Sequence, residues 1–581
     1  MRPRTPARQI VDQNVAEPVT HHDKGTLSDL VGSYRDGRIT RRAFVRNSAA
    51  LGVSLTSLSA VLSACGSSQR SETDTGGGGK GKLAVGIPVD ADTLDPQAFK
   101  TIPGYYILAN LYDQLIDSQP QEEDGILVAT GETTAPMLAR SMELSKDRRT
   151  ATFKLNPKAT FSDGTPVTVE DVEYTFRRGI EGTQYTKLVM GMLTLSSAKN
   201  IEIVDKQTIR FKLDKSNPMT ERLMSLQVMS PQSKKVSEQN AKGKDKWADE
   251  YWRAHVLGTG AYTLKSWKRG ESAELAPNRK YYQQGLPKNG GLQFRIISDA
   301  EERLNLLRSG TLHVAYEVPA KDCAAIRDDE GGEVKLISRP SPWSFGLTFN
   351  NEKAPFKDRA VRQALSSAIP YQAIIDDVMF GLARPAKSMV PPGMATHDPS
   401  AWKYDTDLQK AKEMLTAAGH PDGFKSSIDV LIGRPEDEKA AILIQANFRK
   451  IGVDVEVNKL AEAQYQEKRN AGSSPMQIVE FYSWVTDPFY HLFWNMLSEN
   501  QFTNSSNYSN PKVDKLILSG LYELDEGKRE SISKEAQALI TEDAPWAFLY
   551  ARDYFVPVAK RLEDYPLWPD QNPRLYRARL A

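Results

Sequence analysis

Residues 291–308 read GLQFRIISDAEERLNLLR, in which a short apolar run is followed at once by a segment with apolar side chains at helical spacing. Another apolar run, VKLIS, follows at residues 334–338. Strand-length runs that alternate with helix-length periodic segments are typical of α/β layers. The sequence therefore predicts a strand at 291–297, a helix at 300–308 and a further strand at 334–338, within an α/β fold.

The same alternation extends through the rest of the chain. We expect strands at residues 82–89 and 150–155 and helices at 105–116 and 169–178. Glu170 and Asp171 fall in the first turn of the last of these helices, where acidic groups suit the helix dipole. Further on, an i, i+3, i+4, i+7 pattern predicts the buried face of a helix at Val361, Ala364, Leu365 and Ala368.

The N-terminal part has the composition of an export signal. Arg41 and Arg42 precede an apolar run at residues 49–64 that serine and threonine dilute and that ends at Cys65. A positive block, a modest apolar stretch and a small-residue end are the three parts of such a signal. A spanning helix needs about 20 predominantly apolar residues, which this run does not supply.

Two short motifs make the signal more specific. TRRAF at residues 40–44 resembles the twin-arginine export motif, and LSAC at 62–65 resembles the bacterial lipobox, in which the cysteine is acylated. We expect residues 1–64 to be an export signal, Cys65 to carry a lipid anchor on the outer face of the cell membrane, and the glycine-rich residues 65–82 to be a flexible tether. Cleaved secretion without lipid and a transmembrane helix are the alternatives.

The charge balance gives no indication of a nucleic-acid partner. The chain has 75 basic and 74 acidic residues, and residues 65–581 alone carry a net charge of about −3. Nucleic-acid binders concentrate basic residues in a patch or stripe. We therefore expect no nucleic-acid partner.

The histidines and cysteines do not form a catalytic constellation. If Cys65 is acylated, Cys323 has no intramolecular partner, and most lone thiols are small buried groups. None of the 7 histidines forms an i, i+4 pair or stands beside a Gly-x-Ser-x-Gly elbow. We expect no enzyme activity, no metal site and no cofactor.

A series of short motifs runs along residues 82–581. FSDGTPVTVEDV at residues 161–172 is the longest. The others are LDP at 94–96, LYDQL at 111–115, GTGAY at 258–262, FNN at 349–351, VRQAL at 361–365, AKEMLTAAG at 411–419, IGV at 451–453, NYSNP at 507–511 and EDAP at 542–545. In this order they resemble the extracellular solute-binding proteins of ABC importers, in the oligopeptide, dipeptide and nickel class, family 5. Most of them suit turns and packing rather than ligand contact.

The resemblance implies a two-lobed fold of the periplasmic-binding-protein type II, enlarged by an extra subdomain in lobe I, with a hinge between the lobes. Residues 340–350 and 547–556 are aromatic, strand-like segments suited to the two crossings between lobes. The expected domains are lobe I at 83–340 with the inserted subdomain at about 112–213, lobe II at 341–547, and a return to lobe I at 548–581.

Residues 480–494, EFYSWVTDPFYHLFW, are the richest candidate for a ligand site. In peptide-binding members of the family a Trp-x-x-Asp unit supplies an aspartate for the peptide ammonium, and Trp484 and Asp487 have that spacing. Pro488 follows sooner than the family pattern has it, and Asp487 could instead cap a helix that starts at Pro488. Both roles stay open, whereas Phe489, Phe493 and Trp494 are expected in the core.

Other candidates come from the same stretch and from the crossings. Arg469 could meet a carboxylate or lie exposed on a helix. Trp343 and Phe345 could line the cleft or fill the hinge, and Tyr550 could belong to the cleft or to the core. The predicted ligand-binding set is Phe481, Tyr482, Trp484, Asp487, Trp343, Phe345, Arg469 and Tyr550.

The resemblance implies a monomeric lipoprotein that captures a solute, with short peptides as the expected ligand, by hinge closure and delivers it to ABC permease subunits. One alternative is a non-peptide ligand, such as an opine-like conjugate, an oligosaccharide or a metal chelate. The other is a receptor that reports a ligand to a membrane partner.

Overall fold

The computed structural model describes residues 81–98, 102–123, 126–329, 331–481, 483–500 and 503–581. The predicted export signal, Cys65 and Tyr482 therefore lie outside the described residues. Within these ranges, every helix is too short or too polar to span a bilayer.

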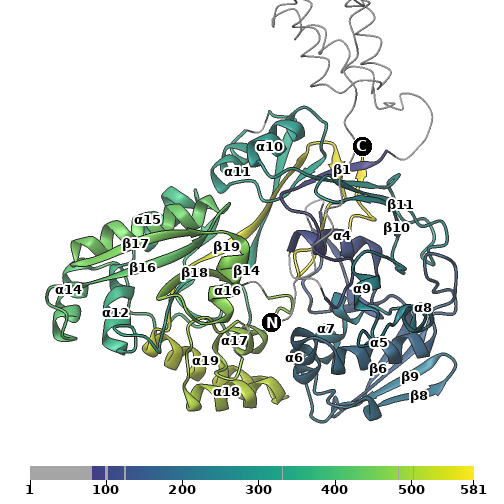
Figure 1. Ribbon diagram of the computed structural model, residues 1–581, viewed down its shortest axis with the longest axis horizontal. Coiled ribbons are helices and arrows are strands. Elements are labelled where there is room, and N and C mark those ends of the chain that lie inside the picture. The colour runs from purple at the N-terminus through teal and green to yellow at the C-terminus, as the bar shows by residue number, and fades with distance from the viewer. Residues whose placement is uncertain (1–80, 99–101, 124–125, 330, 482, 501–502) are drawn as a thin grey trace, which may run out of the picture. The chain divides into compact units, whose positions relative to one another are not determined.

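One sheet of eleven strands organises the described chain, in the order β10-β11-β12-β1-β13-β19-β14-β18-β16-β17, with β15 (Ala383–Arg384) beside β19. The first half-sheet consists of β10 (Tyr262–Lys268), β11 (Ser272–Pro277), β12 (Leu292–Ile296), β1 (Leu83–Ile87) and β13 (Val314–Ala315). The second half-sheet consists of β18 (Met476–Phe481), β16 (Phe424–Leu431) and β17 (Val453–Leu460). Figure 1 shows the two half-sheets in different parts of the molecule.

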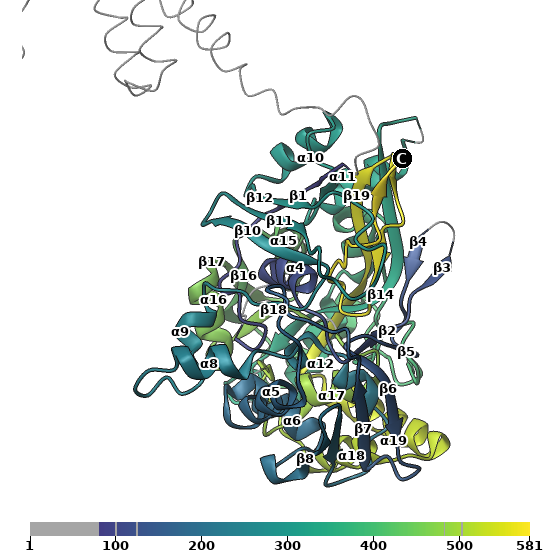
Figure 2. The same cartoon turned by 90° about the vertical axis from the view of Figure 1, so that its right-hand side faces the viewer.

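Two long antiparallel strands, β14 (Val334–Phe349) and β19 (Trp546–Ala559), join the half-sheets. Figure 2 shows them side by side. One end of β19 pairs with β13, through Val314 and Val558, and the other end of β14 pairs with β18. The prediction of two separate segments at 334–338 and 340–350 is therefore wrong, because both belong to one strand. The ladder skips from Arg339 to Trp343, so the two prolines between them, which have no N–H to donate, fall at an irregularity.

Helices cover both half-sheets. Around the first half-sheet lie α4 (Ile102–Leu111), α10 (Ala300–Arg308) and α11 (Ala320–Arg327), and α12 (Arg359–Ala368), α14 (Leu408–Ala417), α15 (Pro435–Lys450) and α16 (Glu462–Asn470) lie around the second (Figure 1). The predicted core face of α12 is confirmed, since Val361, Ala364, Leu365 and Ala368 are all fully buried. The helix predicted at 105–116 ends earlier, because the chain leaves α4 at Leu111 and enters a short strand at Ile116.

A four-stranded sheet, β6 (Ala139–Leu144), β7 (Thr150–Leu155), β9 (Thr208–Lys212) and β8 (Ile201–Asp205), forms an inserted subdomain with α5 (Val169–Glu181), α6 (Gln184–Met192), α7 (Thr220–Met224), α8 (Lys234–Asn240) and α9 (Asp249–Trp252). Thr168 and Asp171 close a capping box at the start of α5. The apolar core of this subdomain is continuous with that of α17 (Pro488–Met496), α18 (Pro511–Tyr522) and α19 (Glu526–Asp543). The subdomain therefore packs against the helices that follow the second half-sheet.

The Gly-Thr-Gly motif holds α4 in place by close backbone approach. A Cβ atom on Gly258 would lie 1.9 Å from the carbonyl oxygen of Leu111, and one on Gly260 would lie 2.8 Å from the Leu111 carbonyl carbon. Neither site has room for a side chain. The motif is thus a packing element, as the sequence predicts.

Asp113, just after α4, should make stability depend on pH. It is 5% exposed and accepts a hydrogen bond of 2.8 Å from the Tyr282 hydroxyl. Burial raises its pKa to about 7, against which that hydrogen bond acts. In the unfolded chain the pKa is about 3.9, so the unfolded state loses the proton first and the folded state loses stability as pH rises from about 4 to 7.

We expect Asp113→Asn to remove this dependence. Between pH 4.5 and 7.5, the free energy of unfolding of the variant should rise by ~3 kcal/mol relative to that of the unchanged protein. Urea unfolding at the two pH values measures it, with the exposed Asp163→Asn as the matched control. Parallel pH profiles for the Asp113 variant and the unchanged protein would contradict the prediction.

Candidate ligand cleft

The carboxyl ends of the two half-sheets point toward each other. β1 is parallel to β12 and β13, and β16 is parallel to β17 and β18. Ligands of α/β sheets bind beyond the carboxyl ends of parallel strands. Because β13 and β18 run antiparallel to β19 and β14, both sets of carboxyl ends face the middle of the crossing strands.

The register measures the space between these ends. Ala315, at the end of β13, is level with Pro557 of β19, and Phe481, at the end of β18, is level with Ser344 and hence with Ala551. Six residues of strand span ~20 Å. This stretch of the crossing strands, between the two sets of carboxyl ends, forms the floor of the candidate cleft.

Trp343 and Arg552 lie opposite each other on this floor. The Arg552 guanidinium carbon lies 4.5 Å from the centroid of the half-buried Trp343 ring and 4.1 Å from that of Phe555. Such stacking fixes a guanidinium while leaving its edge free to donate hydrogen bonds. The Arg552 Nε atom is buried without a hydrogen-bond partner within the described residues.

A charged cluster occupies the wall formed by the second half-sheet. Arg434, at the start of α15, is ion-paired with Glu480 of β18 and lies 3.9 Å from Asp437. Burial raises the pKa of Asp437 to about 7, while the Arg434 charge acts against this shift. Glu317 lies just beyond β13 in the first half-sheet. Burial raises the pKa of its carboxyl group, although the nearby Arg434 charge acts against this shift.

Trp484 connects the second half-sheet to the rest of the molecule. It is half-buried, and its ring lies 5.3 Å from that of Tyr105 on α4 and 5.9 Å from that of Tyr185 on α6. The two tyrosines come from the first half-sheet's helices and from the inserted subdomain. This predicted site residue therefore stands where three parts of the fold meet.

Asp487 caps α17, which was one of its two predicted roles. Its Oδ1 accepts a hydrogen bond of 2.9 Å from the Phe489 N–H, and the side chain is 1% exposed. The same oxygen lies 2.7 Å from Nη2 of Arg529, and Oδ2 lies 3.5 Å from Nη1 of Arg222 in the inserted subdomain. Contact between Asp487 and a ligand stays a prediction.

The other predicted residues divide between core and cleft. Phe345 and Tyr550 stack on each other at 4.7 Å and are 4% and 1% exposed, so they belong to the core. Phe481 is half-buried, with its ring 4.8 Å from that of His491. Arg469 is half-buried rather than exposed. Burial raises the pKa of Tyr465, and the charges of Arg469 and Arg434 act against this shift, whereas Glu480 adds to it.

Sequence reasoning missed Glu317, Arg434 and Arg552, and it included Glu480 only as the first residue of the candidate stretch 480–494, without a role of its own. No motif marks them, and only their places in the topology bring them together. Glu317, Arg434 and Glu480 lie at or within three residues of strand ends, a signal that the predicted strands could have given. Arg552 would have required the register of the crossing strands.

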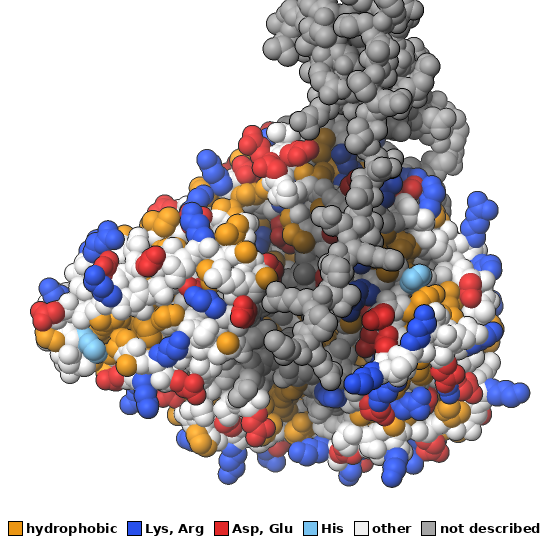
Figure 3. All heavy atoms as spheres, in the orientation of Figure 1, with side chains coloured by type: hydrophobic (Ala, Val, Ile, Leu, Met, Phe, Trp, Pro, Cys, Tyr) orange, Lys and Arg blue, Asp and Glu red, His pale blue; other side chains and the backbone are white. Residues whose placement is uncertain are grey.

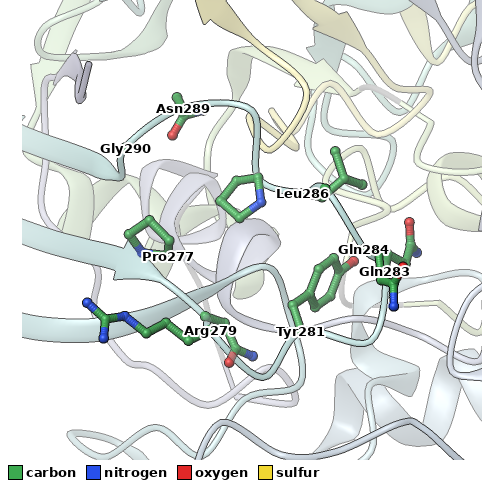
Figure 4. A pocket seen from close by; sticks show the side chains of 11 residues that line it. Pro277, Arg279, Tyr281, Gln283, Gln284, Leu286, Asn289 and Gly290 are labelled. Carbon is green, nitrogen blue, oxygen red and sulfur yellow. The ribbon is translucent and has the colours of Figure 1, made fainter. Parts of the chain in front are cut away.

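Other features of the described residues do not compete with this cleft. A recess of about 510 Å³ lies on the loop between β11 and β12, where Tyr281, Gln283 and Leu286 surround it (Figure 4). It lies at the amino end of β12, away from the facing carboxyl ends. In the described ranges, groups of three or more His, Cys, Asp or Glu side chains able to hold a metal are absent. Cys323 is a buried free thiol, and burial raises its pKa.

Charges of both signs are mixed over the visible face (Figure 3). The picture shows no continuous basic stripe among the coloured side chains there. This face therefore carries no footprint of the kind that nucleic acids require.

Comparisons with known proteins agree with this arrangement. The probable D,D-dipeptide-binding periplasmic protein DdpA of Escherichia coli K12 is 26% identical over 504 residues, covering 84% of this chain and 92% of that protein. The glutathione-binding protein GsiB of Salmonella typhimurium is 27% identical over 455 residues, covering 75% and 84%.

Solved structures show the same fold. DppA from Helicobacter pylori, in complex with the peptide STSA, superposes with a TM-score of 0.76 at 24% identity, covering 86% of this chain and 98% of that one. The dipeptide-binding protein from Pseudoalteromonas sp. SM9913, in complex with Met-Leu, gives 0.76 at 22% identity, covering 86% and 100%. The predicted two-lobed α/β fold is thereby confirmed.

The family model of the bacterial extracellular solute-binding proteins, family 5 Middle, matches residues 133–504, which is more than half of the chain. The chain therefore belongs to the family 5 extracellular solute-binding proteins, whose members bind solutes and are not enzymes.

Proposed function

We propose that this protein captures short peptides between its two lobes and delivers them to the permease of an ABC importer. The observation that carries the proposal is the pair of facing carboxyl ends, with Trp484 packed against Tyr105 and Tyr185 beside them. Relatives named for dipeptides and glutathione, and neighbours solved with peptides, support this ligand class.

Within this proposal, lobe I comprises residues 83–340 and 548–581, and lobe II comprises residues 341–547. The inserted subdomain of lobe I, predicted at about 112–213, extends further along the chain, since α7, α8 and α9 continue it to Trp252. Closure occurs about the irregular part of β14 between Arg339 and Trp343, where the ladder to β19 is interrupted. Few ladder hydrogen bonds need to break there when the lobes move, so the interruption suits a hinge.

The protein would act as a monomer on the outer face of the cell membrane. Arg41 and Arg42 would direct export, and acylated Cys65 would hold the mature chain there. Two or more acyl chains give stable anchoring, which one chain does not. Metabolic labelling with a radioactive fatty acid tests this, since Cys65→Ala should remove the label.

Titration calorimetry with di- to pentapeptides tests the capture of peptides. At least part of this panel should bind, and Trp484→Ala should weaken binding ten-fold or more, because it removes an aromatic contact made when the lobes meet. Trp267→Ala, on the outer strand β10, is the matched control and should leave the affinity unchanged. Failure of every peptide to bind would overturn the proposal.

A non-peptide ligand is the second candidate. It is favoured by one observation, that the Asp487 carboxylate already contacts Arg529 and Arg222 and so does not await a peptide ammonium. Native mass spectrometry of the protein as purified, with fragmentation of the released ligand, distinguishes the two, since only a peptide gives the fragment series of amide-bond cleavage.

A further inference from the structure

Glu317 lies just after β13, at a turn whose backbone is held by Arg303. Its backbone adopts a φ of 52°, which is uncommon for a residue other than glycine. Buried Arg303 fixes this turn by donating to the carbonyl oxygens of Tyr316 at 3.0 Å and of Glu317 at 2.7 Å. A strained conformation that its surroundings enforce is characteristic of functional positions.

The Glu317 side chain is exposed, so a ligand can reach its carboxylate. Surrounding protein atoms raise the pKa of this carboxyl group. Within the described chain the carboxylate has no ion pair, whereas Glu480 and Asp437 nearby are already engaged by Arg434.

Arg552 is the corresponding cation. The described residues give its guanidinium no salt bridge, Trp343 and Phe555 hold it, and its Nε is buried without a hydrogen-bond partner there. Burial raises the pKa of Glu317, and the charges of Arg434 and Arg552 act against this shift, although Glu317 and Arg552 do not pair with each other. A buried donor without a partner is destabilising unless something binds it.

The spacing of these two groups limits the size of a ligand. Val314 pairs with Val558, so the turn at Glu317 stands near the level of Phe555, about three residues of strand from Arg552. That is ~10 Å at the backbone, which an extended chain of about three residues spans.

We propose that Glu317 and Arg552 form a subsite for the two charged ends of a zwitterion of di- or tripeptide size. Glu317 receives the ammonium from lobe I, and Arg552 receives the carboxylate on the crossing strand. This inference rests on the proposed function and names the ligand class more closely. It assigns the ammonium to lobe I, where the sequence alone points to Asp487 of lobe II.

Charge-blocked ligands test each half of the subsite separately. The tightest-binding di- or tripeptide of the panel is prepared with a free, an N-acetylated and a C-amidated end. Glu317→Gln should weaken binding of the free peptide ten-fold or more and leave binding of the N-acetylated form unchanged. Arg552→Gln should weaken binding of the free peptide ten-fold or more and leave binding of the C-amidated form unchanged. Arg552→Lys should recover part of the loss.

Matched controls are Glu143→Gln on the edge strand β6 and Arg253→Gln after α9. Both side chains are exposed, and both variants should bind as the unchanged protein does. Thermal unfolding midpoints of all variants show that the fold is intact. Equal losses for free and blocked peptides, or no loss, would overturn the inference while leaving peptide capture standing. Absence of any binding in the panel would overturn both.

Discussion

Replacing Arg178 with alanine should cost ~3–5 kcal/mol of unfolding free energy, because it leaves a buried carboxylate without its cation. The Arg178 side chain on α5 is 4% exposed, and that of Asp95, its partner between β1 and α4, is 0% exposed. Nη1 donates to Asp95 Oδ1 at 2.9 Å, and Nη2 contacts Oδ2. Asp249 lies 2.6 Å from Nη2 as well. Urea unfolding measures the loss.

The neighbouring Arg177 is the matched control. Its side chain is 35% exposed and lies 3.7 Å from Glu173 one turn away, so Arg177→Ala should cost less than about 1 kcal/mol. Arg178→Lys keeps the charge without the two-pronged geometry and should fall between the two alanine variants. A cost for Arg178→Ala no larger than that of Arg177→Ala would show that the Asp95 pair contributes little.

Local periodicity was sufficient to predict many elements of the fold. The predicted strand at 150–155 and the predicted helix at 300–308 match β7 and α10 at both ends. The segment after α4 was misread because Leu111, Leu115 and Ile116 continue a helical spacing. All three are buried, but the last two belong to a loop and to β2 (Ile116–Ser118). The spacing of apolar residues predicts which side chains are buried. It predicts a helix only when capping and turn residues also mark where the helix begins and ends.

The candidate site was harder to predict, because its residues come from places far apart in the sequence. Trp484 and Asp487 were found because they share one short stretch. Glu317 and Arg552 are 235 positions apart, and only the pairing of β13 with β19 brings the segments that carry them side by side. Phe345 and Tyr550 were chosen for their aromatic character, which core and cleft share, and the structure places them in the core.

Replacing Asp487 with alanine should lower the unfolding free energy by ~3 kcal/mol, since two effects add. The N-cap bond to Phe489 is worth about 1 kcal/mol, and the 13% exposed Arg529 side chain loses the carboxylate that lies 2.7 Å away. Asp525→Ala is the matched control. Asp525 is an exposed cap, accepting from Lys528 N–H at 2.8 Å, and should cost only about 1 kcal/mol. Equal losses would mean that the arginines contribute nothing.

A second substitution of Asp487 tests which lobe binds the ammonium group of the ligand. We expect Asp487→Asn to weaken binding of free and N-acetylated peptides by the same factor, because both carboxylate oxygens already face arginines and the change would act through the contact between Arg222 and α17. Calorimetry with the two peptide forms measures this. A loss confined to peptides with a free amine would make Asp487 the ammonium partner and remove Glu317 from that role.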